Sequence, residues 1–423
     1  MSLGNTQRLY FFDNLRYLMI VFVVMGHTAI GYSHIIPWWP VIDSNQSVIV
    51  DILLAIGEIF TVPVLFFVSG FFVISSIKRR GVLSFLHSNL IRLGLVWLII
   101  VLLVNPVFSY LFQYTRNHDW VTGSYGDFWI QYMLDTIRFK TGYISTMDML
   151  PSDQPKIMSH FNQYHVWFIS LLMSFFCFVC LACGLNKAID YCKVRPMDLT
   201  RRIKNISPSL ILSLMALFMA ISVYVAHFYI YTYSNYYDPW VSIGHLLQFQ
   251  PTRFFIYFFS FLLGIFAFLN QWFQNDHSFI ERPWVWIISC GLLAALYLLS
   301  IDILMNDPTL LWLGIYSIAR SLLCVTSLVV ILSLARRHWN KTSTLGRLLS
   351  GYSFNVYLIH LIFVVMLQWL MLGFAWPGIA KWIFISILSL IVSYAICHYV
   401  IDRSPRIFAV GFLSLFISII FIF

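Results

Sequence analysis

Long apolar segments constrain the fold of this 423-residue chain more than any other feature of its sequence. A helix needs roughly 20 apolar residues to cross a bilayer core that is about 30 Å thick, and eleven segments are long enough to do so. They lie near residues 15–36, 48–77, 86–114, 164–185, 207–230, 252–273, 284–304, 309–335, 352–373, 379–401 and 406–423. The sequence therefore predicts an all-α, polytopic helical membrane protein.

The composition excludes the other common classes. Hydrophobic residues make up 60% of the chain and charged residues 10%, whereas soluble domains have about 45–50% and about 25%. No stretch is polar enough to close a separate soluble domain over a core, so a soluble globule, a disordered protein and a nucleic-acid binder are excluded. Pro63 and Pro106 fall inside two of the longest apolar segments, where each predicts a kink.

Neither a signal peptide nor a metal cluster is indicated. The apolar run from Leu15 to Ile36 has no small-residue cleavage site, so we expect a retained helix. Cys177, Cys180 and Cys183 have the spacing of an iron–sulfur run. They stand among large apolar residues, which favours packed thiols in a membrane helix. We expect no metal and no tightly bound cofactor.

The basic residues predict how the chain is oriented. With a cytoplasmic N-terminus, the inner side carries 19 Lys and Arg residues and the outer side carries 6. Most membrane proteins show such an excess in their short cytoplasmic loops. The net charge of +9 has the same explanation and requires no anionic partner. We therefore expect the N-terminus in the cytoplasm.

One connection is much longer than the others. It runs from about residue 115 to 163 on the predicted outer side, and loops of this length are usually functional or disordered. From Phe128 to Ile137, apolar and polar residues alternate at helical spacing. This pattern predicts an amphipathic helix at the membrane interface.

Two polar residues share one face of the first predicted helix. Arg16 and His27 are eleven positions apart, and eleven steps of about 100° return a helix almost to the same face. The two residues are about 16 Å apart along the axis at 1.5 Å per residue. With Arg16 at the inner headgroups, we expect His27 near the middle of the bilayer core, where an imidazole must be paired or hydrated. Alternatively, Arg16 is an inner-surface anchor and His27 bonds a neighbouring helix.

Glu58 lies about ten residues into the second predicted helix. Ionisable residues at such depth are functional candidates by default. A carboxylate beside His27 would fix its tautomer and stabilise its charged form, which makes Glu58 a candidate catalytic residue. Alternatively, Glu58 pairs with Arg320, about midway along the eighth segment. The sequence leaves both partners open.

Further polar residues are expected deep in the helices or near the membrane faces. His165 and Trp167 open the fourth segment, Arg253 opens the sixth, and His360 lies within the ninth. Basic residues around the connection after the second segment have the chemistry to clamp the phosphates of a cytoplasmic donor. They are Lys78, Arg79, Arg80 and Arg92. Alternatively, these basic residues only orient the chain in the membrane, and this role predicts the same cluster.

Motif absences narrow the functional classes. The chain has no Walker loop, no G-x-G-x-x-G, no HExxH and no G-x-S-x-G, which disfavours ATP-driven transport and zinc proteolysis. A transporter or flippase also needs polar groups on kinked helices, so residue chemistry alone favours it about as much as an enzyme. A scaffold explains the aromatic-rich external loop but not the aligned Arg16 and His27.

Several sequence blocks together resemble a known family. They are Tyr10-Phe11-Phe12-Asp13-Asn14-Leu15-Arg16 followed by His27, then Phe66-Phe67-Val68-Ser69-Gly70-Phe71, His165-Val166-Trp167-Phe168, Tyr357-Leu358-Ile359-His360 and Asp402-Arg403-Ser404-Pro405. In this order, the chain resembles the membrane-bound acyltransferase-3 family, and within it bacterial members that act in glucan biosynthesis. Family members often end the last core helix with Glu-x-Pro, from which the last block departs.

The resemblance implies a fold and an activity. The fold is a ten-helix acyltransferase core over residues 1–405, with residues 406–423 as an added eleventh helix. The activity is transfer of an acetyl- or succinyl-class acyl group to a hydroxyl of an extracytoplasmic glycan or glycolipid. The donor is a cytoplasmic acyl-CoA-type co-substrate. The implied location is the bacterial inner membrane.

The resemblance also implies roles for single residues. Arg16 lies on the donor side, and His27 is the catalytic base, since a sugar hydroxyl is too weak an acid to attack a thioester unaided. Ser69 is an alternative nucleophile, although a Ser-Gly pair more often permits close helix packing. The acceptor-side or supporting residues are Asp13, Ser69, His165, Trp167, Arg253, Arg320 and His360.

Overall fold

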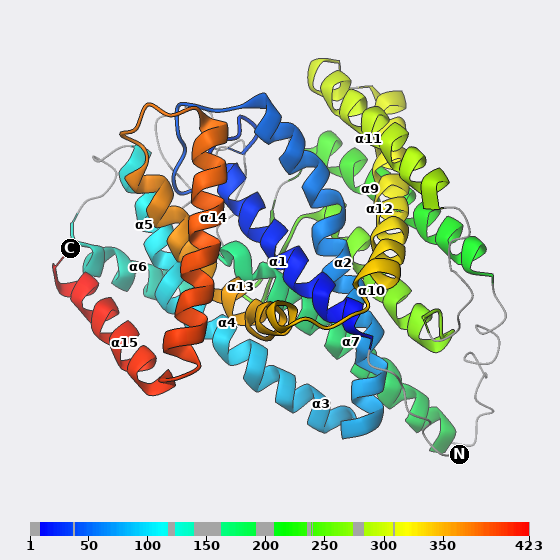
Figure 1. The fold of residues 1–423 in the computed structure, drawn as a ribbon, viewed down its shortest axis with the longest axis horizontal. Coiled ribbons are helices and arrows are strands. Elements are labelled where there is room, and N and C mark those ends of the chain that lie inside the picture. Colours follow the sequence, from blue (N-terminus) through cyan, green and yellow to red (C-terminus); the bar gives the residue numbers. More distant parts are fainter. Residues whose placement is uncertain are drawn as a thin grey trace.

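All eleven predicted segments are helical in the computed structural model of the chain (Figure 1). The structure describes residues 9–36, 39–116, 123–138, 162–191, 207–234, 238, 240–273, 283–307 and 309–422. Within these ranges, nine helical segments are long and apolar enough to cross a membrane. The first and last predicted segments, which are not among those nine, are helices as well. The predicted all-α, polytopic class is confirmed.

The elements have the following order along the chain. Before the long external connection lie α1 (Tyr10–Ile30), α2 (Val48–Arg80), α3 (Val82–Asn89), α4 (Val96–Ile99) and α5 (Asn105–Arg116), with π-helical segments at Leu90–Leu95 and Ile100–Val104. Later come α6 (Tyr125–Ile137), a 3₁₀ turn at Tyr164–Val166, α7 (Trp167–Tyr191), α9 (Pro208–Ser234), the antiparallel strands β1 (Val241–Ile243) and β2 (Leu247–Phe249), and α10 (Pro251–Leu269). The last are α11 (Pro283–Asn306), α12 (Leu310–Trp339), α13 (Thr344–Leu370), α14 (Gly378–Ile396) with a π-helical end at Cys397–Ile401, and α15 (Pro405–Ile422).

Helix α1 runs through the middle of the bundle (Figure 1) and packs against α2, α13 and α14. It ends at Ile30, six residues before the predicted end. The chain leaves the helix there because the Ser33 hydroxyl and the His34 backbone N–H donate to Asp51 Oδ1 at 2.6 and 2.9 Å. His27 therefore lies in the last turn of α1, nearer to a helix end than the apolar run from Leu15 to Ile36 indicates.

Two glycines let α2 and α10 approach backbone to backbone. A methyl group at Gly70 would overlap the carbonyl oxygen of Phe261, and one at Gly264 would overlap the carbonyl oxygen of Phe67. Small residues permit such close crossings in membrane bundles. Ser69, the neighbour of Gly70, donates its hydroxyl to the Leu65 carbonyl of its own helix at 2.8 Å. The Ser-Gly pair thus lies at a close helix contact.

The irregularity predicted at Pro106 takes the form of the π-helical segment that precedes it. Proline has no N–H for the carbonyl four residues earlier, and its ring displaces that carbonyl. Here, the Leu102 carbonyl instead accepts a hydrogen bond from Trp129 Nε1 at 3.0 Å. The neighbouring Val101 carbonyl accepts from the Tyr132 hydroxyl at 3.1 Å. Both donors belong to α6, so this helix satisfies backbone groups that the proline frees.

Helix α6 confirms the helix predicted around residues 128–137. Ser124 and Asp127 form a capping box at its start, and hydrogen bonds from Ser124 lower the pKa of the Asp127 carboxyl. Helix α15 packs against α6, with the rings of Trp129 and Phe416 5.7 Å apart. Most of the predicted external loop, residues 117–122 and 139–161, falls outside the described residues.

Candidate functional site

Three histidines from distant parts of the sequence meet at one end of the bundle. His27 comes from the end of α1, His165 from the 3₁₀ turn before α7, and His360 from α13. The ring centroids of His360 lie 5.1 Å from those of His27 and 5.3 Å from those of His165. His27 and His165 are 6.4 Å apart. The sequence named all three residues, and the structure places them together.

Hydrogen bonds assign a tautomer to His360 and, through it, to His27. His360 Nδ1 lies 2.7 Å from the Tyr357 carbonyl oxygen. A carbonyl only accepts, so Nδ1 carries the proton, and in a neutral ring Nε2 is then an acceptor. His27 Nδ1, 2.8 Å from His360 Nε2, therefore donates to it. This leaves His27 Nε2 as a nitrogen that can accept a proton.

The same reasoning applies to His165. Its Nε2 lies 3.2 Å from the Leu358 carbonyl oxygen and donates to it. Its Nδ1 is then an acceptor, and this atom is buried without a hydrogen-bond partner. Over the part of the chain that the structure describes, no group of three His, Cys, Asp or Glu side chains is arranged to hold a metal ion.

A cavity of about 40 Å³ lies beside His27 and His165. Three of its lining residues are tryptophans, Trp39, Trp167 and Trp240. The indole of Trp39 stacks on the imidazole of His27, with centroids 5.6 Å apart and planes 13° from parallel. The other lining residues are Ile30, Asn162, Tyr164 and Gln248.

The loop between α1 and α2 is tied firmly beside the cavity. Trp39 Nε1 donates to Gln368 Oε1 at 2.8 Å, and the Trp39 carbonyl accepts from Arg116 Nη2 at 2.8 Å. Further along, Lys381 Nζ lies 2.6 Å from Asp43 Oδ2, and both side chains are almost wholly buried. A buried ion pair is costly to break. These contacts hold Trp39 over His27.

The other wall of the cavity contains a strained residue. Tyr164 has a φ of 39°, a conformation in which bulky residues are rare. Its backbone N–H donates to Asn162 Oδ1 at 2.8 Å, and its hydroxyl lies 3.3 Å from the Ser109 hydroxyl. Strain of this kind is kept where the surroundings fix it, often at functional sites. Here, it orients the segment that presents Asn162 and His165.

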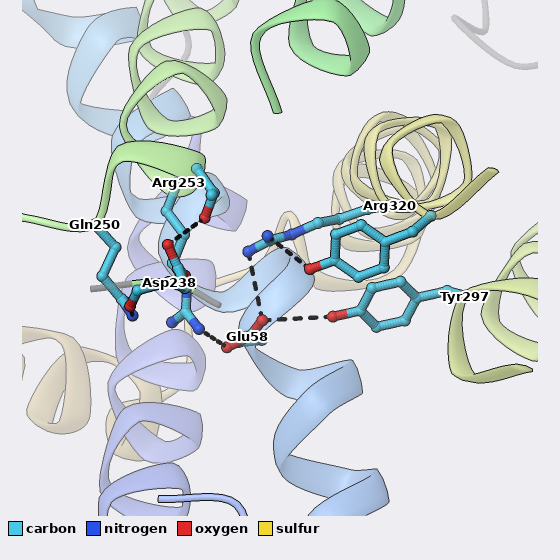
Figure 2. Close-up of polar contacts among 8 residues, drawn as sticks. Glu58, Asp238, Gln250, Arg253, Tyr297 and Arg320 are labelled. Atoms are coloured by element: carbon cyan, nitrogen blue, oxygen red, sulfur yellow. Dashed lines mark hydrogen bonds and ion pairs between the residues drawn. The ribbon is translucent and has the colours of Figure 1, made fainter. Parts of the chain in front are cut away.

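Glu58 belongs to a separate cluster, shown in Figure 2. Its carboxylate lies 2.8 Å from Arg253 Nη2 and 3.5 Å from Arg320 Nη2, and the Tyr297 hydroxyl donates to it at 3.5 Å. Arg253 Nε lies 3.2 Å from Asp238 Oδ2. Of the two partners that the sequence left open, the structure therefore shows Arg320, joined by Arg253. The hydrogen-bond partner of His27 is His360 and not Glu58.

The cluster around Glu58 joins α2, α10 and α12 (Figure 2). Its two guanidinium groups face two carboxylates, so the charges balance. Arg320 is buried, and such an arginine requires paired charges around it. No sequence pattern singles out Asp238, which stands in a connection among aromatic residues.

The predicted donor-side residues lie toward the other end of α1 and α2. The Arg16 side chain is 41% exposed and pairs with Asp13 at 3.3 Å, and its guanidinium lies 5.1 Å from the Phe72 ring. The other four residues are exposed at the end of α2 and in the helical segment after it: Lys78, Arg79, Arg80 and Arg92.

A further basic residue, which no sequence pattern assigns to the donor, lies at this end. Arg336 of α12 lies over the Phe273 ring at 5.9 Å. Phe273 contacts Phe12, and Phe12 contacts Phe72, beneath Arg16. The aromatic motif at the start of α1 thus lies between two exposed or partly exposed cationic groups.

Fold and site together define a polytopic helical membrane protein with a histidine-lined cavity at one end and a basic surface at the other. A family model described as an acyltransferase domain, that of the acyltransferase-3 family, matches residues 9–398. The chain belongs to this family and is an integral membrane acyltransferase. The predicted resemblance is confirmed at this level. No curated protein and no solved structure matches the chain.

Proposed function

We propose that the protein transfers an acetyl- or succinyl-class acyl group from a cytoplasmic acyl-CoA-type donor to a hydroxyl of an extracytoplasmic glycan or glycolipid. The observation that carries the proposal is the hydrogen bond from His27 Nδ1 to His360 Nε2, which leaves His27 Nε2 available as a general base. The order of the sequence blocks, similar to that of glucan-modifying members, supports a bacterial inner-membrane enzyme with a glucan acceptor.

In the proposed reaction, His27 Nε2 accepts the proton of the acceptor hydroxyl while its oxygen bonds to the thioester carbonyl carbon. The carbon–sulfur bond then breaks, and the leaving sulfur takes up that proton. The products are an ester and a free thiol. A positioned base of this kind contributes about 10²–10⁴ in rate. No acyl-enzyme is needed, and the Ser69 hydroxyl is already bonded to the Leu65 carbonyl.

The two ends of α1 suit the two substrates. Arg16 and His27 share one face about 16 Å apart, so a donor held at Arg16 would extend its thioester toward His27. Guanidinium groups bind phosphates through paired hydrogen bonds. Arg79 and Arg80 have exposed side chains at the same end of the molecule as Arg16. This supports a binding site for the donor phosphates at that end.

The test uses the purified full-length protein with acetyl-CoA or succinyl-CoA and gluco-oligosaccharides, with mass spectrometry of the acceptor as the readout. The wild type should form an ester. His27→Ala should lower turnover per folded molecule about 10²–10⁴-fold and keep donor binding. His338→Ala, at an exposed site near the end of α12, is the matched control.

Activity of His27→Ala within a few-fold of wild type would remove His27 as the base. Movement of a labelled sugar across a vesicle membrane without any new ester would instead favour the transporter class. In cells, loss of an ester mass from envelope glycans when the protein is removed would identify both acyl group and acceptor.

A further inference from the structure

We propose that Asn162 and His165 bind the acceptor sugar, and that the cavity admits only its hydroxymethyl arm, so that the enzyme acylates a primary hydroxyl of a pyranose. The inference rests on the proposed transfer to a sugar hydroxyl and names the part of the sugar that reacts.

Two buried polar atoms at the cavity have no partner in the described part of the protein. Asn162 is 2% exposed and His165 is 4% exposed. Asn162 Oδ1 accepts from the Tyr164 N–H, whereas its Nδ2 is unpaired. His165 Nδ1 is unpaired as well. Native proteins keep few such atoms, and both residues line the same cavity, so a ligand that completes their hydrogen bonds is expected.

The types of these atoms select the chemistry of that ligand. Asn162 Nδ2 is a donor, whereas His165 Nδ1 and His27 Nε2 are acceptors. A hydroxyl both accepts and donates, so one hydroxyl has the chemistry to accept from Asn162 and donate to His27, and a second hydroxyl of the same sugar has the chemistry to donate to His165. A carboxylate only accepts and an ammonium only donates. Neither group alone would satisfy one donor and two acceptors.

The walls of the cavity point to an uncharged ring. Among the described residues that line it, none is Lys, Arg, Asp or Glu. Trp167 and Trp240 pack edge to face with ring centroids 5.5 Å apart, and Trp39 stacks on His27. Aromatic faces with a few convergent polar groups are typical of sites for neutral ligands. They match the apolar faces and hydroxyl edges of a pyranose.

The size of the cavity selects which hydroxyl can enter. The cavity is small, about 40 Å³. The hydroxymethyl group is the hydroxyl-bearing arm that projects farthest from a pyranose ring, so it reaches deeper into a small cavity than a ring hydroxyl does. The ring therefore stays against the tryptophans while its hydroxymethyl group projects inward.

The first test compares acceptors. The purified full-length protein is given acyl-CoA with a β-linked glucose disaccharide, an analogue that has no primary hydroxyl on either ring (the 6-deoxy analogue) and its 4-deoxy analogue, and NMR locates any ester. We expect the ester on a primary hydroxyl and at least a hundredfold lower kcat/KM for the 6-deoxy acceptor, because that acceptor lacks the hydroxyl that the site would present to His27. The 4-deoxy acceptor should retain transfer with a raised KM.

The second test uses two near-isosteric variants. Asn162→Asp keeps the oxygen that accepts from the Tyr164 N–H and removes the amide donor. His165→Gln keeps an N–H for the Leu358 carbonyl and removes Nδ1. Each should lower kcat/KM for the disaccharide about tenfold to a hundredfold at unchanged affinity for acyl-CoA. In His165→Gln, the penalty for the 4-deoxy acceptor should vanish. Asn306→Asp and His338→Gln, both exposed, are the matched controls.

The outcomes separate this inference from the proposed function. An ester on a ring hydroxyl, or equal kcat/KM for the disaccharide and its 6-deoxy analogue, would overturn the inference and leave the acyltransferase in place. So would hydrolysis of acyl-CoA without transfer to the disaccharide, or full transfer by Asn162→Asp. No ester on any acceptor, together with unconsumed acyl-CoA, would overturn the proposed transfer itself.

Discussion

His27 is oriented by a second imidazole, whereas the bases of many hydrolases are oriented by a carboxylate. A carboxylate both fixes the tautomer and stabilises the charged ring. His360 performs the first task, because its Nδ1–H is committed to the Tyr357 carbonyl. It brings no negative charge, so it does not stabilise a protonated His27 as a carboxylate would. This arrangement suits the proposed base, which passes its proton on to the leaving thiolate.

We predict that His360→Ala lowers kcat about tenfold to a hundredfold with little change in acceptor KM. The variant leaves the Nδ1–H of His27 unpaired, which costs about 1–3 kcal/mol, and it releases the ring from its orientation. His360→Gln, whose amide can accept from His27, should restore part of the rate. Steady-state kinetics on folded protein decide the matter, and equal loss in both variants with reduced yield would mark a purely structural residue.

We predict that Arg16→Ala raises the dissociation constant for acyl-CoA about tenfold or more, because hydrogen bonds to charged groups contribute about 1.5–3 kcal/mol. Arg16→Lys should recover only part of the affinity, since lysine lacks the paired donors of arginine. Calorimetry on purified protein measures both. Arg138→Ala, exposed beside α6, is the control. Equal donor affinity in Arg16→Ala and wild type would leave Arg16 with a topology role.

Residue patterns predicted some of the site and could not predict the rest. The spacing of Arg16 and His27 is a property of one helix, so the sequence shows it directly. The contact of His27 with His360 joins residues 333 positions apart, and no local period encodes it. Asn162 and Trp39 are ordinary polar and aromatic residues of connections. Only three-dimensional features single them out: the burial of Asn162 with its unpaired amide nitrogen, and the stacking of Trp39 on His27.

The presence of each helix was predictable because the length of its apolar run determines it. The residues at which the helices begin and end were harder to predict, since local hydrogen bonds determine those residues. Asp51 ends α1 early by bonding Ser33 and His34. Helix α13 begins at Thr344, eight residues before its apolar segment, because the Ser343 hydroxyl accepts from the Gly346 N–H and caps the helix. A search for apolar segments detects neither of these hydrogen-bond patterns.

We predict that Gly70→Ala destabilises the protein by about 1–3 kcal/mol, the usual cost of overpacking a tight contact. The added methyl group meets the Phe261 backbone, which cannot move aside as a side chain can. Gly291→Ala on α11, where an added methyl group meets nothing within 4 Å, is the matched control and should be neutral or slightly stabilising. Melting temperatures in detergent measure both. Equal melting of the two variants would refute the close crossing.

The histidine-lined cavity and the basic residues around Arg16 lie toward opposite ends of α1, the central helix. We predict that the end with Gly81 faces the cytoplasm and that Ser124 faces outward. Cysteines placed at these positions, in a background without native thiols, should react with an impermeant reagent in intact cells only at Ser124. Permeabilised cells control for access to Gly81. Labelling at Gly81 and not at Ser124 in intact cells would reverse the orientation.

The contacts around the cavity also fix when it can form during synthesis. His27 bonds His360, Trp39 bonds Gln368, and Asp43 bonds Lys381. In each pair, the second residue lies more than 300 positions later in the chain, so the contact forms only after that residue is synthesised. At about 5–20 residues per second, the first helix is made roughly 15–70 s before its histidine can be oriented. A chain that stops before α13 and α14 therefore lacks the His27–His360 hydrogen bond and the contact that holds Trp39 to Gln368. The ribosome completes the proposed catalytic site only near the end of synthesis.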